Sequence, residues 1–200
     1  MKDKYANFDE LAKAEIRGKD YQILWRKRAA VTVVIAPHGG GIEPGTSEIA
    51  EAIAGANLSF YAFEGRNKHN KDLHIKSTNF DEPRCVALVA ASECVVAIHG
   101  QGGKENVVRL GGLDEDMKQR LHDSLRRGKF PVEIIPKGGR HEGRQVDNIC
   151  NRGIRGAGVQ MELLKGMRQK FFKSLKTRKG RESRKPRFDD FVTAVRRVIA

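Results

Sequence analysis

Apolar and polar residues alternate along this chain with two different periods, which predict a regular succession of strands and helices. Nearly continuous or alternating apolar runs predict strands at 21–28, 29–37, 58–65, 93–100, 107–110, 131–138 and 158–164. Apolar residues at helical spacing predict helices at 7–17, 46–55, 81–92, 113–128, 166–175 and 188–200. Such alternation predicts an α/β fold, a three-layer sandwich around a central mixed sheet.

Length and charge add a domain count and a class of partner. The chain has 200 residues, which fits one domain spanning 1–200. Its 38 Lys and Arg exceed its 25 Asp and Glu, for a net charge of +13, so we expect a polyanionic partner. A segment at about 174–187 supplies part of the excess and reads as a solvated loop.

Targeting signals and disulfides are not indicated. No apolar stretch reaches the length that crosses a bilayer, so we expect no membrane partner. The first residues lack the apolar region of a Sec signal, so cytoplasmic synthesis is expected, with release by lysis if a phage encodes the protein. The three cysteines show no CxxC spacing, so we expect them to be buried free thiols. We expect the protein to be a monomer.

Two histidines and two glutamates follow the ends of three predicted strands. His38 and Glu43 come after the strand at 29–37, His99 closes the strand at 93–100, and Glu162 lies in the last strand. The carboxyl ends of strands in open α/β sheets are where sites form. Two His and one Glu are a common zinc ligand set that leaves one position open, and a further Glu suits a general base. The sequence therefore indicates a catalytic zinc site.

The glycine-rich stretch PHGGGIEPGTS, which links His38 to Glu43, leaves alternatives open. Its outline fits a phosphate-binding loop, but Thr46 stands where that loop has its lysine, and Glu43 would repel phosphate. Each histidine alone could also be a buried core residue. A loop that bends back through its glycines would instead bring Glu43 beside His38.

Five stretches together resemble one family. They are PHGGGIEPGTSEIA, LHIKSTNFDEP, VVAIHG, GGLDEDMKQRL and DNICNRGIRGAGVQMEL, in that order and within residues 5–175. On these motifs the chain resembles the phage-type poly-γ-glutamate hydrolases, zinc enzymes with a fold similar to that of the metallocarboxypeptidases.

The resemblance implies roles for individual residues. It makes His38, Glu43 and His99 the zinc ligands and Glu162 the general base. It also implies that Arg152, with Asn151, binds a substrate carboxylate, a role that suits a guanidinium group. Asn148 and Asn151 could instead form hydrogen bonds only within their loop. His74 would line the cleft, and Arg109 is a further candidate for holding an acidic side chain.

The implied function is zinc-dependent hydrolysis of the γ-glutamyl amide bonds of poly-γ-glutamate, and the positive charge fits so anionic a substrate. One alternative keeps the zinc hydrolase but changes the substrate to a peptidoglycan γ-glutamyl bond or an acylated amino acid. Another is a replication-associated protein that binds nucleic acid through the basic segment. The basic residues there lack interleaved aromatics, which disfavours the nucleic-acid alternative.

Overall fold

A computed structural model describes residues 3–200 and contains a seven-stranded mixed sheet. The strands are β1 (Tyr21–Arg26), β2 (Thr32–Gly40), β3 (Ser59–Gly65), β4 (Cys94–Gln101), β5 (Val108–Gly112), β6 (Val132–Ile134) and β7 (Val159–Leu164). They lie in the order β1-β3-β2-β4-β7-β5-β6. The central strands β3, β2, β4 and β7 are parallel, whereas β1 and β5 run antiparallel to their neighbours β3 and β7.

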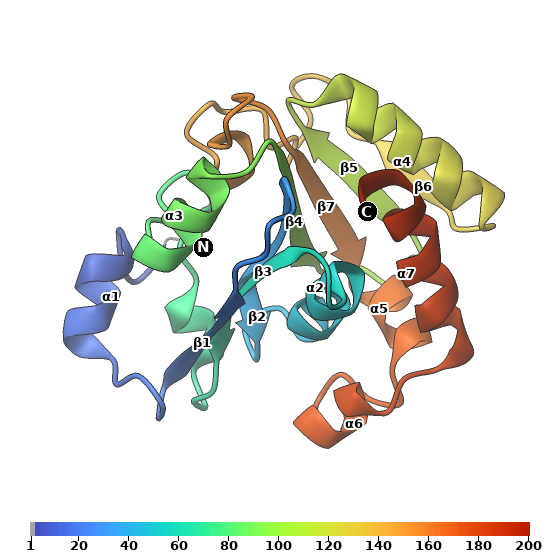
Figure 1. Cartoon of the computed structure of the whole chain (residues 1–200). Coiled ribbons are helices and arrows are strands. Elements are labelled where there is room, and N and C mark those ends of the chain that lie inside the picture. The colour runs from blue at the N-terminus through green and yellow to red at the C-terminus, as the bar shows by residue number, and fades with distance from the viewer. Residues whose placement is uncertain (1–2) are drawn as a thin grey trace.

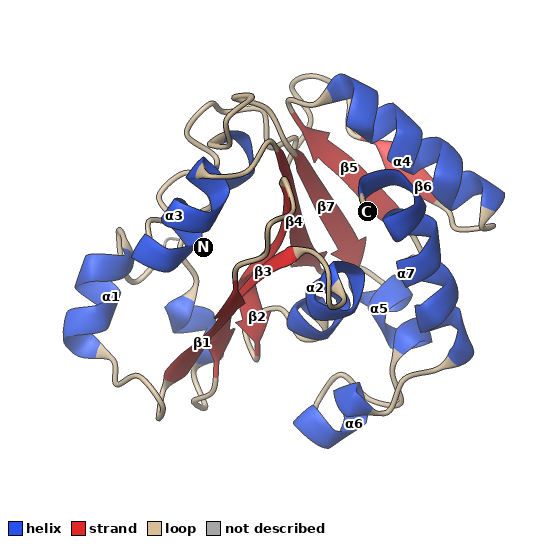
Figure 2. Ribbon diagram, viewed as in Figure 1, coloured by secondary structure: helices blue, strands red, loops and turns tan. Residues whose placement is uncertain are grey.

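Helices cover both faces of the sheet, as Figures 1 and 2 show. They are α1 (Phe8–Ala14), α2 (Thr46–Ala54), α3 (Pro83–Ala90), α4 (Glu115–Arg127), α5 (Lys165–Phe171), α6 (Arg178–Glu182) and α7 (Pro186–Ile199), with short 3₁₀ turns η1 (Asn70–Leu73) and η2 (Ile149–Asn151). One hydrophobic cluster joins the sheet to α2, α4, α5 and α7, and a second joins it to α1 and α3. The predicted three-layer α/β sandwich is therefore confirmed.

The long helix α4 illustrates how the local sequence sets an element. Asp114 accepts a hydrogen bond from the Met117 N–H and caps the first turn, while Arg126 and Arg127 lie in the last turn. Leu121 and Leu125 are buried on one face. Among residues 3–200, no helix is both long and apolar enough to span a bilayer.

The strand β2 continues beyond Pro37, where we predicted its end. Its register with β3 shifts between Ala36 and Gly39, so a bulge carries the pairing on to Gly40. Gly40 has φ of 63°, and a Cβ there would lie 2.5 Å from the Gly65 carbonyl oxygen. The glycines therefore allow close strand packing, whereas we expected them to serve as a flexible loop.

The basic segment at 174–187 is mostly exposed, as a solvated loop would be, but it is not a loop throughout. It contains α6, and the side chain of Arg181 is largely buried. Arg181 Nε donates to Glu48 Oε1 at 2.6 Å and Nη1 donates to the Leu175 carbonyl at 3.1 Å. The middle of the segment is thus attached to α2.

Candidate active site

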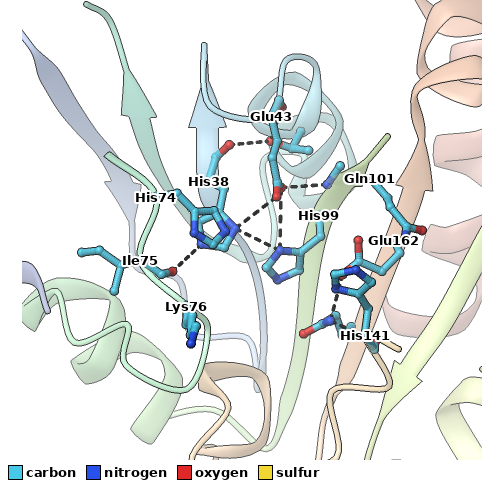
Figure 3. A network of polar contacts seen from close by, with 12 residues as sticks. His38, Glu43, His74, Ile75, Lys76, His99, Gln101, His141 and Glu162 are labelled. Atoms are coloured by element: carbon cyan, nitrogen blue, oxygen red, sulfur yellow. Dashed lines mark hydrogen bonds and ion pairs between the residues drawn. The ribbon is translucent and has the colours of Figure 1, made fainter. Parts of the chain in front are cut away.

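A cleft of about 1150 Å³ opens at the carboxyl ends of β2 and β4. Two loops form its walls, one at 74–78 and one at 138–145. His38, Glu43, His99 and Glu162 all line it, so the structure brings together the four residues that the sequence singled out (Figure 3).

Three of these side chains present donor atoms at the spacing of metal ligands. His38 Nδ1 lies 3.2 Å from His99 Nδ1 and 3.3 Å from Glu43 Oε1, and His99 Nδ1 lies 3.7 Å from Glu43 Oε2. Tetrahedral zinc ligands at about 2.0–2.1 Å from the ion would be about 3.3–3.4 Å apart. The cluster therefore fits a zinc ion.

Backbone hydrogen bonds orient His38 and Glu43 within the cluster. His38 is buried, and its Nε2 lies 2.7 Å from the Ile75 carbonyl, so Nε2 carries the proton and the Nδ1 lone pair faces Glu43. The N–H of Glu43 donates to the His38 carbonyl at 2.9 Å, which turns the chain back after β2. Glu43 Oε2 accepts from the Gly100 N–H at 2.7 Å.

The electrostatics give Glu43 and His99 the protonation states that metal ligands need, whereas His38 favours its charged form more strongly than a free histidine does. Burial would raise the pKa of Glu43, but the attraction of His38 outweighs it and lowers the pKa to about 2. Burial lowers the pKa of His99 to about 3, so its imidazole is neutral at pH 7. Burial also disfavours charge on His38, but Glu43 outweighs it and raises the pKa of His38. The negative charge of Glu43 thus stabilises a proton on His38, and a cation bound at the cluster would take the place of that proton.

His74 gives a second ligand set to compare. Its ring lies 4.1 Å from that of His38, and ligand atoms of His38, Glu43 and His74 lie within 4.8 Å of one another. His74 Nδ1 already bonds Asp3 Oδ1 at 2.9 Å. His99 Nδ1 lies 3.2 Å from His38 Nδ1. Which of the two histidines is the third ligand therefore stays a prediction.

Glu162 lies in β7 beside the cluster, paired in register with His99 of β4. Burial, and to a smaller extent the charge of Glu43, raise its pKa to about 8. Its Oε1 accepts from Gln160 Nε2 at 2.9 Å, and Gln160 Oε1 accepts from Asn148 Nδ2 at 2.9 Å. A buried, oriented carboxylate with a raised pKa is suited to accept a proton.

Sequence reasoning missed two residues beside Glu162. Gln160 and Asn148 orient its carboxylate. His141 is exposed to solvent and also lines the cleft. His141 has φ of 64°, and its carbonyl accepts from Gln160 Nε2 at 3.3 Å. In the sequence, only the glycines around His141 pointed to this loop, because glycines are typical of tight turns.

Arg152, which we predicted to contact substrate, donates to backbone carbonyls of neighbouring loops. Its guanidinium donates to the carbonyls of Asp147 at 2.7 Å, Thr78 at 2.6 Å and Phe80 at 3.1 Å. These bonds join the loop at 74–80 to η2, and Arg152 does not line the cleft. Three of its five N–H donors are therefore used within the protein, and its role in substrate binding stays a prediction.

Asn151 and Arg109 are also engaged elsewhere. Asn151 is buried, and its Nδ2 donates to the carbonyls of Gly143 and Gln145, both at 2.8 Å. Arg109 lies in β5, and its Nε donates to Glu133 Oε2 at 3.1 Å. Neither side chain lines the cleft, whereas His74, the other residue predicted to contact substrate, does.

Two histidines and two glutamates in a cleft at the carboxyl edge of a mixed α/β sheet are typical of metal-dependent hydrolases. Comparison with known proteins gives the family. The chain belongs to the poly-gamma-glutamate hydrolase family, whose model matches residues 5–194. The family resemblance seen in the sequence is therefore confirmed, and with it the assignment as a hydrolase.

Similar proteins come from Bacillus subtilis and from a bacteriophage. The UPF0714 protein YndL of Bacillus subtilis (strain 168) is 32% identical over 98% of this chain and 78% of its own length. The structure of a bacteriophage poly-gamma-glutamate hydrolase has a TM-score of 0.94 at 29% identity, covering 98% of this chain and 96% of that one. A structure described as "YNDL-apo (Zinc-free)" also has a TM-score of 0.94, at 32% identity over 98% of this chain and 97% of that one.

Proposed function

We propose that this protein is a zinc-dependent hydrolase that cleaves the γ-glutamyl amide bonds of poly-γ-glutamate. In this proposal His38, Glu43 and His99 hold the zinc, and Glu162 is the general base. The main support is the cluster of His38, Glu43 and His99, in which the two Nδ1 atoms lie 3.2 Å apart and each lies 3.3 or 3.7 Å from one carboxylate oxygen of Glu43. The family match and the zinc-free form of a relative at 32% identity support it further.

The chemistry divides between the metal and the protein. A zinc held there would supply positive charge that polarises the scissile carbonyl and makes a water more acidic. Glu162 takes a proton from the attacking water as the C–O bond forms. It then returns the proton to the nitrogen as the C–N bond breaks, which releases a carboxylate and an amine. Gln160 keeps Glu162 in position through its hydrogen bond to Oε1.

The charge of the protein suits the proposed substrate. A γ-linkage leaves a free carboxylate on every glutamate, so the polymer is densely anionic. Lys76 lies on one wall of the cleft and Arg140 on the other, and the chain carries a net charge of +13. Such a field concentrates an anionic polymer near the site.

A comparison of three polyanions tests the substrate assignment. With zinc present, we expect γ-linked polyglutamate to shorten, α-linked polyglutamate to be cleaved at least about 100-fold more slowly, and single-stranded DNA to remain intact. Displacing the reacting bond by about 1 Å from its productive position can lower the rate about 100-fold. Chain length is measured by gel filtration, with boiled enzyme as the control. Equal cleavage of both linkages, or none of the γ-linked polymer, would contradict the assignment.

A further inference from the structure

The cleft holds a carboxylate of the protein itself. Asp3 lines the cleft, and its side chain is 17% exposed. Its Oδ1 lies 2.9 Å from His74 Nδ1, and its Oδ2 accepts from the Lys76 N–H at 2.7 Å. Both carboxylate oxygens are therefore bound by donors of the 74–78 wall.

These donors lie close to the proposed reacting groups and on a wall rich in other donors. The His74 ring lies 4.1 Å from the ring of His38. Lys76, Ser77 and Thr78 also line the cleft. Figure 3 shows His74 and Lys76 on the same side of the His38, Glu43 and His99 cluster. A carboxylate bound here would flank the bond to be cleaved.

The wall is held in place without Asp3. Arg152 bonds the carbonyls of Thr78 and Phe80, and the Ile149 N–H donates to the Ser77 carbonyl at 2.9 Å. These bonds fix the wall to η2. The two bonds of Asp3 are therefore not needed to shape the wall.

The segment that carries Asp3 is also anchored independently. Asn79 Nδ2 donates to the Ala6 carbonyl at 3.1 Å, and the Phe8 N–H donates to Asp81 Oδ1 at 2.7 Å. Asp81 thus binds the start of α1, and Glu82 caps α3. Rotation of the Asp3 side chain alone would free the donors of His74 and Lys76.

We propose that His74 and the backbone N–H of Lys76 form a subsite for a substrate carboxylate, which Asp3 fills in the free enzyme. The inference rests on the proposed function, because it assigns a carboxylate next to the scissile bond of that substrate. Substrate must displace Asp3, so the apparent affinity equals the intrinsic affinity multiplied by the fraction of enzyme whose subsite is free. Asp3 is then an intramolecular competitor.

Replacing Asp3 tests the subsite. We expect Asp3→Ala to lower KM for γ-linked polyglutamate about three- to tenfold, as for a subsite that Asp3 fills about 70–90% of the time. Zinc content and kcat should not change. Asp9→Ala is the matched control, because it removes the same charge from the same segment, and Asp9 forms an exposed ion pair with Lys13. We expect no change in its KM beyond twofold.

A binding measurement removes the dependence on turnover. In a Glu162→Gln background, calorimetry with a short γ-linked oligoglutamate should show about three- to tenfold tighter binding when Asp3 is also Ala. Unchanged or weaker binding in the folded, zinc-loaded double variant would overturn the subsite. That result would leave the proposed function intact wherever the wild type still cleaves the polymer. Absence of cleavage by the wild type would instead refute the proposed function.

Discussion

Glu162→Gln should lower kcat on γ-linked polyglutamate by about 10²–10⁴-fold, the usual contribution of a general base. The amide cannot take a proton from water, but it has the shape of the carboxylate and can still accept from Gln160 Nε2, which now binds Oε1 at 2.9 Å. The zinc ligands are untouched, so metal content should not change. Chain-length assays and elemental analysis of the same sample measure both quantities.

Glu133→Gln is the matched control for this substitution. Glu133 is exposed on β6 and pairs with Arg109, so the same change of charge occurs away from the cleft. We expect its kcat to stay within twofold of the wild type. A Glu162→Gln variant that keeps most of its activity would show that another group is the base.

His99→Ala should lose both the metal and the activity. His99 Nδ1 lies 3.2 Å from His38 Nδ1, and the substitution leaves only two of the three proposed ligands. Removing a hydrogen-bond partner that orients a metal ligand typically lowers metal affinity or activity 10–100-fold. Removing the ligand itself should therefore lower metal affinity more than about 100-fold. The measurement is zinc per chain after dialysis, together with kcat.

Two further histidine variants sharpen this result. His122→Ala removes a histidine of α4 whose Nδ1 lies 3.1 Å from Asp123, and it should keep full zinc content. His74→Ala should also retain zinc, because His74 is not among the proposed ligands. If His74→Ala lost the metal while His99→Ala kept it, the ligand set would instead be His38, Glu43 and His74.

The fold and the four central residues could be predicted because each has a local signal. Apolar runs marked the strands, and parallel strands bring their carboxyl ends to one edge of the sheet. His38 and His99 stand near two such ends, and the register of β4 with β7 places Glu162 beside His99. The sequence could therefore indicate the site without giving the strand order.

The surroundings of the site could not be predicted, because they depend on contacts between distant segments. Gln160 looks like any polar residue in a strand, and only the approach of the loop at 138–145 and of Asn148 gives its amide a fixed orientation. Arg152 looks suited to bind a carboxylate, yet three backbone carbonyls use its donors. Likewise, only the fold brings Asp3 to His74, 71 positions apart in the sequence.

Zinc removal and replacement test the central claim most directly. The protein is treated with a chelator, and the shortening of γ-linked polyglutamate is followed before and after stoichiometric zinc is added back. We predict that about one zinc per chain is lost with the activity, and that both return together, since one cluster of three donors fits one ion. Full activity in the zinc-depleted protein would contradict the account.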